Sequence, residues 1–137
     1  QVDASMLYTS DHGEDIFDDG RHLFLHASPV PSYYQLHVPL LLWTSDSYRE
    51  EYPGIEKAAS MNRQKNISSS ISFFQTMMEL AGIETPYRND SLSVTSPLYT
   101  EKSRVYLNDH NEPRPLDDIG MRKEDFEMLK KRGIDAQ

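Results

Sequence analysis

The residues best suited to chemistry are the adjacent Asp11 and His12, which follow a short apolar segment. A carboxylate and an imidazole can reach one cation if the backbone turns between them, and Gly13 makes such a turn easy. Zinc accepts this mixture of oxygen and nitrogen ligands, whereas calcium prefers oxygen alone. The pair therefore predicts part of a zinc site, and the competing interpretation is a solvated acidic loop.

Two further side chains extend this candidate site. Glu14 can orient His12, because imidazoles that bind a metal usually donate their second N–H to a carboxylate or carbonyl; the alternative is an ordinary surface acid. His26 would by itself be a loop histidine, and only its neighbours along the chain make it a candidate. His37 opens an apolar segment, which favours a structural role, and His22 and His110 receive no role.

The negative net charge of the chain favours a cation as ligand over a nucleic acid. Lys and Arg number 14 against 22 Asp and Glu, which gives a net charge of −8 and disfavours nucleic acid and anionic membrane surfaces. The first twenty residues contain no Lys or Arg, and they hold Asp3, Asp11, Glu14, Asp15, Asp18 and Asp19. The sequence has no cysteine, which excludes cysteine zinc fingers and thiol nucleophiles.

The elements that must position these residues are short. Strands are expected over residues 5–10 and 38–43. In the first, Met6, Leu7 and Tyr8 stand together, which is typical of a strand buried on both faces in a parallel sheet, and the second reads as another core strand. Ligands commonly bind in the loops at the carboxyl ends of such strands. The segment 38–43 is also the longest apolar run, too short to span a membrane.

The remainder of the chain reads as helices and loops. A buried helix is expected over 68–81, because apolar residues recur there at steps of three and four and Gly82 follows. Residues 48–59 are weakly helical at best, since Pro53 and Gly54 interrupt them. We further expect an irregular loop over 23–39, a surface loop over 85–103, a strand over 104–107 and a helix over 123–132.

Three motifs occur in order around the candidate site: Thr-Ser-Asp-His-Gly-Glu at 9–14, Leu-His-x-x-Pro at 25–29 and His-Val-Pro at 37–39. This string resembles the metal-binding stretch of the alkaline phosphatase/sulfatase superfamily, most closely its lipid A phosphoethanolamine transferase branch. The resemblance implies that Asp11 and His12 are zinc ligands. It also implies that His26 faces the phosphoryl group or holds a second metal.

The resemblance implies an α/β fold, a partial alkaline-phosphatase-like (sulfatase) fold with a mostly parallel sheet core and flanking helices. Residues 1–137 would form the carboxyl-terminal portion of a sulfatase-like catalytic domain. Roughly residues 84–137 would be a polar peripheral extension with a short strand and a terminal helix. The abrupt start of the chain also looks like the middle of a domain.

The function implied is zinc-dependent transfer of phosphoethanolamine from phosphatidylethanolamine to lipid A or a related glycan through a phospho-threonine intermediate. The threonine would lie upstream of this chain, so the chain alone would be inactive. The parent would be anchored in the bacterial inner membrane with its catalytic domain in the periplasm, this chain being soluble itself. The alternatives are a sulfatase or other phosphoester hydrolase of the superfamily, and a non-catalytic metal-binding or interaction module.

Overall fold

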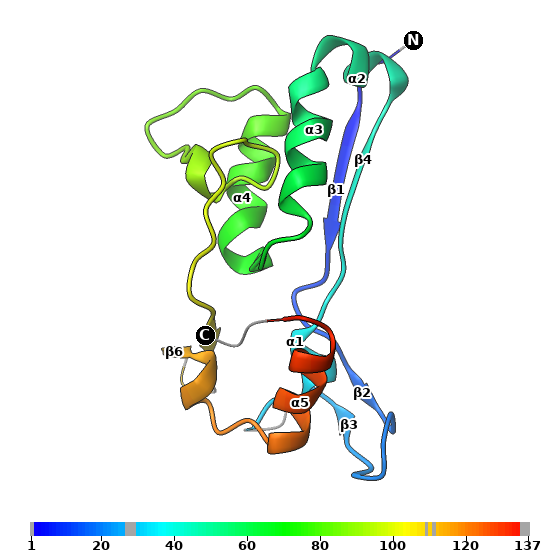
Figure 1. Ribbon diagram of the computed structural model, residues 1–137, viewed down its shortest axis with the longest axis vertical. Coiled ribbons are helices and arrows are strands. Elements are labelled where there is room, and N and C mark those ends of the chain that lie inside the picture. The colour runs from blue at the N-terminus through cyan, green and yellow to red at the C-terminus, as the bar shows by residue number, and fades with distance from the viewer. Residues whose placement is uncertain (1, 27–29, 109, 111, 135–137) are drawn as a thin grey trace. The chain divides into compact units, whose positions relative to one another are not determined.

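The computed structural model describes residues 2–26, 30–108, 110 and 112–134. The chain folds into two compact units, each made of two separate stretches of sequence (Figure 1). Unit 1 contains Gln1–Thr9 and Leu40–Lys102. Unit 2 contains Ser10–Pro39 and Ser103–Gln137, and it therefore carries all the candidate site residues.

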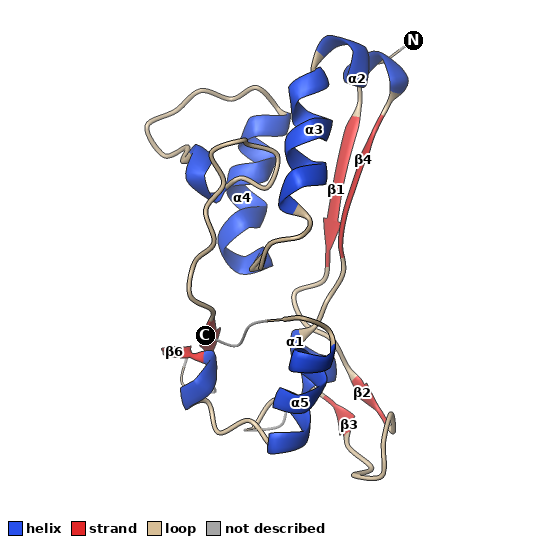
Figure 2. Ribbon diagram, in the orientation of Figure 1, coloured by secondary structure: helices blue, strands red, loops and turns tan. Residues whose placement is uncertain are grey.

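Unit 1 combines a two-stranded ladder with helices (Figure 2). Its elements are β1 (Ser5–Thr9), β4 (Leu40–Thr44), α2 (Asp46–Glu51), α3 (Pro53–Asn62), α4 (Ser69–Leu80) and the 3-10 helix η1 (Asp90–Leu92). β1 pairs with β4, and α4 packs against β1. The two predicted strands and the predicted helix over 68–81 are therefore confirmed to within two residues at each end.

The predicted parallel sheet, buried on both faces, is wrong for the described residues, because each strand pair that they form is antiparallel. Thr9, the end of β1, lies opposite Leu40, the start of β4, so the chain leaves and re-enters the ladder at the same end. A parallel pair would need a crossover back to the other end. Burial alternates along both strands, and Met6 and Trp43 are each about half exposed.

Two helices replace the weakly helical segment expected over 48–59. Pro53 is the first residue of α3, a position where the missing N–H costs nothing, so it starts a helix.

The interior of α4 also differs from the expected apolar stripe. Its buried residues are Ser72, Thr76 and Leu80, whereas Phe74 is 55% exposed.

The loop that follows α4 explains this polar interior. Residues 93–96 were expected at the surface but are buried, which makes the prediction of a surface loop wrong for this part of 85–103. The Nδ2 atom of Asn62 donates to the carbonyl oxygens of Val94 and Ser96, at 3.0 and 2.8 Å. The Oγ1 atom of Thr76 accepts from the N–H of Val94 at 3.0 Å. Small polar groups can be buried here because each finds a partner.

Unit 2 contains a small apolar core. Its elements are β2 (Asp15–Ile16), β3 (Phe24–Leu25), α1 (Tyr33–Leu36), β5 (Val105–Leu107), β6 (Pro113–Pro115), η2 (Leu116–Asp118) and α5 (Lys123–Lys131). The core consists of Tyr33, Leu116, Met121 and Leu129, and α1 packs against α5. The strand and helix predicted near 104–107 and 123–132 are confirmed as β5 and α5. The expected irregular loop over 23–39 instead contains β3 and α1.

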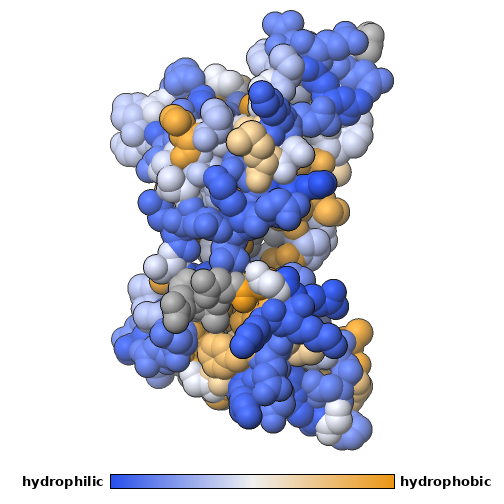
Figure 3. Space-filling view, in the orientation of Figure 1, coloured by the Kyte–Doolittle hydropathy of each residue, from blue (hydrophilic) through white to orange (hydrophobic). Residues whose placement is uncertain are grey.

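The face shown in Figure 3 is mainly hydrophilic, in keeping with the mean hydropathy of −0.67. No described helix is both long enough and apolar enough to cross a bilayer.

Candidate functional site

The candidate site is built on the hairpin formed by β2 and β3. Asp15 lies opposite Leu25 and Ile16 opposite Phe24 in an antiparallel pair. Glu14 directly precedes this pair and His26 directly follows it. The pairing therefore brings two residues that are twelve positions apart in sequence to the same end of the hairpin.

His12, Glu14 and His26, here called the histidine cluster, lie within reach of one ion. Their ligand-type atoms are all within 4.8 Å of one another. Nδ1 of His26 is 2.6 Å from Oε1 of Glu14, and Nδ1 of His12 is 3.8 Å from the same oxygen. The two imidazole rings are 3.9 Å apart at their centroids and are tilted by 32°. All three side chains keep roughly two fifths to one half of their surface exposed, so a ligand can reach them.

The hydrogen bonds of His12 identify the nitrogen that can bind a metal. Its Nδ1 lies 3.0 Å from the carbonyl oxygen of Gly13, which can only accept, so Nδ1 carries the proton and Nε2 keeps its lone pair. Nε2 is 3.8 Å from Oδ2 of Asp11. Ligands of a tetrahedral zinc ion lie about 3.4 Å apart, given bonds of about 2.0–2.2 Å. Because the Asp11 side chain is 88% exposed, it is free to close this difference, and the donor set fits zinc.

The structure places His12 beside both Asp11 and His26, and it gives Glu14 a different partner from the expected one. The expected acceptor for His12 was Glu14, whereas the closer acceptor is the carbonyl of Gly13. Glu14 instead pairs with His26, a contact that sequence reasoning missed. The signal that could have found it is the turn at residues 18–20 between two short apolar segments, which is typical of a hairpin. Within the Leu-His-x-x-Pro motif, residues 27–29 lie outside the described residues.

The segment that carries His12 and Glu14 lies tightly against α1. The N–H of Gly13 donates to the carbonyl of Gln35 at 2.8 Å. A Cβ atom added at Gly13 would lie 1.9 Å from the carbonyl oxygen of Tyr34, so this close approach requires glycine. The buried carboxylate of Asp15 accepts from Oγ of Ser32 at 2.6 Å and from Nε2 of Gln35.

A second anchor holds the far side of the hairpin. The Arg21 guanidinium binds Asp19 and the fully buried Asp125 of α5, with Nη1 at 2.7 Å from Oδ2 of Asp125. Asp125 also accepts from the N–H of Tyr33 at 2.8 Å. The hydrogen bonds from Arg21 lower the pKa of Asp19, and those to the two carboxylates raise the pKa of Arg21. The carboxylate of Asp125 in α5 thereby binds both the hairpin, through Arg21, and α1, through the N–H of Tyr33.

The remaining histidines behave differently. Nδ1 of His37 lies 2.6 Å from the hydroxyl of Tyr33, and the rings stack at 5.0 Å, which agrees with a structural role. Burial, together with the positive charges of Arg132 and Arg104, lowers the pKa of His37. His22 adopts a φ of 54° beyond the hairpin turn and is not part of the histidine cluster.

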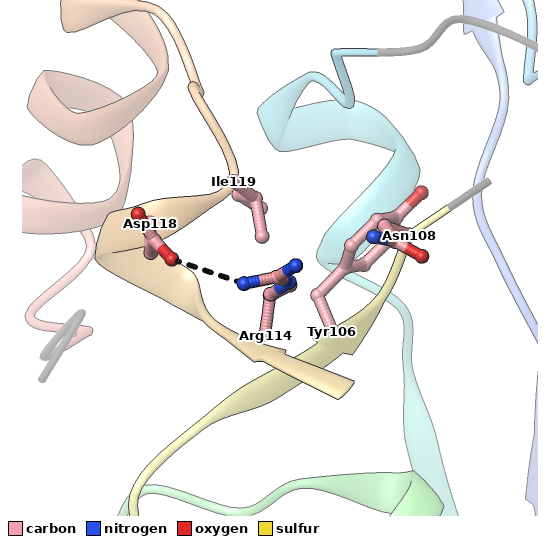
Figure 4. Close-up of a pocket in the computed structure, with 5 residues that line it drawn as sticks. All are labelled: Tyr106, Asn108, Arg114, Asp118 and Ile119. Carbon is pink, nitrogen blue, oxygen red and sulfur yellow. Dashed lines mark ion pairs between the residues drawn. The ribbon is translucent and has the colours of Figure 1, made fainter. Parts of the chain in front are cut away.

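A separate cavity of about 340 Å³ lies beside the β5–β6 hairpin of unit 2. It is lined by Tyr106, Asn108, Arg114, Asp118 and Ile119 (Figure 4). The Arg114 guanidinium points toward Asp118, at 3.9 Å, and also binds Glu112 at 2.9 Å. The lining does not include any member of the histidine cluster, so the cavity is not part of the candidate metal site.

Comparison with known sequences finds a family and several relatives that this chain resembles. The family model named Sulfatase matches residues 2–83. The chain is 32% identical to the phosphoethanolamine transferase EptA of Salmonella typhimurium over 97 residues, 69% of this chain and 17% of EptA. It is 29% identical to the phosphoethanolamine transferase CptA of the same organism over 113 residues, 82% of this chain and 19% of CptA. The chain thus spans less than a fifth of either relative.

Solved structures similar to this chain also come from a phosphoethanolamine transferase. The C-terminal periplasmic domain of EcEptC from Escherichia coli matches with a TM-score of 0.64 and 26% identity, over 74% of this chain and 28% of that domain. Its zinc complex matches with a TM-score of 0.61 and 23% identity, over 88% of this chain and 33% of that domain, a likeness of fold alone. The partial sulfatase fold and the resemblance to phosphoethanolamine transferases are confirmed by these matches. The chain belongs to the Sulfatase family.

Proposed function

We propose that this chain is part of a zinc-dependent phosphoethanolamine transferase, which moves phosphoethanolamine from phosphatidylethanolamine to lipid A or a related glycan. The observation that carries this proposal is the pair of donors at one point, Nε2 of His12 and Oδ2 of Asp11, beside the histidine cluster. The relatives are named phosphoethanolamine transferases, and one of the matching structures is a complex with Zn. Both facts favour this function.

Asp11 and His12 would hold the zinc ion, with further ligands from outside the chain. When bound, zinc offsets negative charge on phosphoryl oxygens and lowers the pKa of a coordinated hydroxyl. The hydroxyl that attacks first would belong to a threonine outside this chain. The parent protein would be anchored in the bacterial inner membrane and present this domain to the periplasm.

His26 would act on the phosphoryl group or on the incoming acceptor. Its Nδ1 faces the Glu14 carboxylate, which leaves Nε2 as the nitrogen open to a substrate. When the Nδ1 proton is donated to this carboxylate, Nε2 keeps its lone pair and can take the proton of an acceptor hydroxyl. Glu14 would therefore orient His26 in addition to its contact with His12.

The test uses the full-length protein, with zinc content and phosphoethanolamine transfer measured on the same preparations. Asp11→Asn with His12→Ala should remove the bound zinc and abolish transfer. His26→Ala should keep the zinc and slow transfer by roughly a hundredfold, the scale of one lost group acting on developing charge. His22→Asn is the control, because asparagine tolerates the positive φ at that position.

Full zinc occupancy in the Asp11/His12 double variant would overturn the metal assignment. Hydrolysis of sulfate esters in place of phosphoethanolamine transfer would favour a sulfatase. Near-normal transfer by His26→Ala, with only a lower melting temperature, would return His26 to a packing role.

A further inference from the structure

Gln35 of α1 contacts the chain beside every member of the histidine cluster. Its carbonyl accepts from the N–H of Gly13, the residue between His12 and Glu14, at 2.8 Å. Its Nε2 donates to the carboxylate of Asp15, the residue after Glu14. The same Nε2 lies 3.5 Å from the carbonyl oxygen of Leu25, the residue before His26. One side chain and its own carbonyl therefore reach both strands of the hairpin and the loop before it.

These contacts are buried and have defined directions. Gln35 is 5% exposed and Asp15 is 2% exposed, so water has little access to replace the bonds between them. Oγ of Ser32 donates to the other oxygen of Asp15 at 2.6 Å, which fixes the orientation of the carboxylate. Ser32 also caps α1, since its Oγ accepts from the N–H of Gln35 at 3.3 Å. The cap orients the helix from which the Gln35 side chain extends.

The hairpin itself cannot hold the cluster with similar strength. β2 and β3 contain two residues each, and a ladder this short is marginal without further support. α1 has independent support, because Tyr33 packs in the apolar core and its N–H binds Asp125. Loss of the Gln35 amide should therefore loosen the end of the hairpin that carries Glu14 and His26, while α1 stays in place and Arg21 still binds Asp125 at the far end.

We propose that Gln35 is a positioning residue that sets the separation of His12, Glu14 and His26. The inference rests on the proposed function, in which His12 helps to hold zinc and His26, oriented by Glu14, acts on a phosphoryl group. Gln35 would act through Gly13, Asp15 and Leu25, without touching the metal or the substrate. Its role resembles that of the outer partners of metal ligands, whose loss weakens metal binding by about 10–100-fold.

The experiment compares Gln35→Met with Gln75→Met in the full-length protein. Both changes keep the volume of the side chain and remove an amide that bridges two groups. In the control, Nε2 of Gln75 donates to the carbonyl of Tyr87 at 3.2 Å and Oε1 accepts from the N–H of Asn89 at 2.7 Å, all within unit 1. The measurements are the zinc dissociation constant by chelator competition, the NMR signals of the histidine-ring nitrogens without metal, and the melting temperature.

We expect Gln35→Met to weaken zinc binding at least tenfold, with His26 losing the single tautomer that its bond to Glu14 imposes. Gln75→Met should bind zinc like the unaltered protein and keep that tautomer. Asp15→Asn, which preserves size and the contact with Ser32, should reproduce the effect of Gln35→Met if that variant folds poorly.

Unchanged zinc affinity and an unchanged His26 tautomer in both Gln35→Met and Asp15→Asn, with only a lower melting temperature, would overturn the positioning role. Absence of zinc binding in the unaltered protein would instead overturn the proposed function. The tautomer signal, which needs no metal, would in that case still show whether Gln35 orders the cluster.

Discussion

Unit 1 and unit 2 differ in whether they fully bury carboxylates. In unit 1 the most deeply buried polar side chains are small and neutral, such as Asn62, Thr76 and Ser93. In unit 2 they include the carboxylates of Asp15 and Asp125, and Asp125 is paired with Arg21. Asn62 and Thr76 are satisfied by backbone groups, whereas a buried charge requires an opposite charge or several donors.

This difference matters for the candidate site. The contacts of Asn62 join residues 32 and 34 positions apart, whereas the pair of Arg21 and Asp125 joins residues 104 positions apart. The loop and hairpin that carry the histidine cluster thus depend on partners from α1 and α5. Removing one partner should therefore cost more in unit 2 than in unit 1.

The largest effect should follow Asp125→Ala. The change leaves the Arg21 guanidinium without its buried partner and the N–H of Tyr33 without an acceptor. We expect the free energy of unfolding to fall by about 3–5 kcal/mol, as in other broken buried ion pairs. Chemical denaturation measures it, with the exposed Asp117→Ala as the control. A loss as small as that of the control would show that the charged network does not support unit 2.

A smaller loss is expected for Gly13→Ala. The new Cβ would lie 1.9 Å from the backbone oxygen of Tyr34, which cannot move without shifting α1. Overpacking of this kind costs about 1–3 kcal/mol of unfolding free energy. Gly20→Ala is the matched control in the same hairpin, since nothing lies within 4 Å of its added Cβ. Equal stability of the two variants would mean that the loop can separate from α1 freely.

In unit 1, Thr76→Val tests the neutral network. Valine keeps the shape of threonine but removes the Oγ1 atom that accepts from the N–H of Val94 and donates to the carbonyl of Ser72. Leaving the Val94 N–H unsatisfied should cost about 1–2 kcal/mol of unfolding free energy. Thr100→Val, at an exposed position, should cost much less. A loss larger than that of Asp125→Ala would reverse the comparison of the two units.

Much of the fold could be predicted from local patterns. Apolar runs indicate β1 and β4, and the acids early and bases late in residues 123–132 indicate α5, which Gly133 ends with a φ of 71°. The burial of residues 93–96 could not be predicted, because these residues are polar and their partners Asn62 and Thr76 come from helices elsewhere in the chain. The prediction of at best a weak helix over 48–59 failed at Pro53, because a proline interrupts a helix in its interior but can begin one at its first residue.

The candidate site shows the same division. Asp11 and His12 are candidates by their residue types and spacing, and His26 is a candidate because it lies in a motif that resembles the family's. The pairing of Glu14 with His26 depends on the register of a hairpin whose strands have two residues each. The contacts of Gln35 depend in turn on how α1 packs against that hairpin. The spacing of residues along the chain predicts neither the register of a hairpin nor the packing of a helix against it.

The smallest effect we expect concerns pH. Partial burial of the His37 ring and the charges of Arg132 and Arg104 lower the pKa of His37 in the folded chain. The unfolded chain takes up this proton near pH 6.5, whereas the folded chain does so only at lower pH. The free energy of unfolding should therefore fall as the pH drops below about 6.5, and this contribution stops growing below the lowered pKa.

Because the His37 ring is partly exposed, its contribution should change the melting temperature by only about a degree or two between roughly pH 7.5 and 5.5. His37→Gln should reduce the drop by that amount. Melting curves at the two pH values provide the measurement. A steeper drop in His37→Gln than in the unaltered protein would mean that His37 gains its proton more readily when folded. The contact between Nδ1 of His37 and the hydroxyl of Tyr33 would then favour the charged ring, and protonation of His37 would stabilise unit 2.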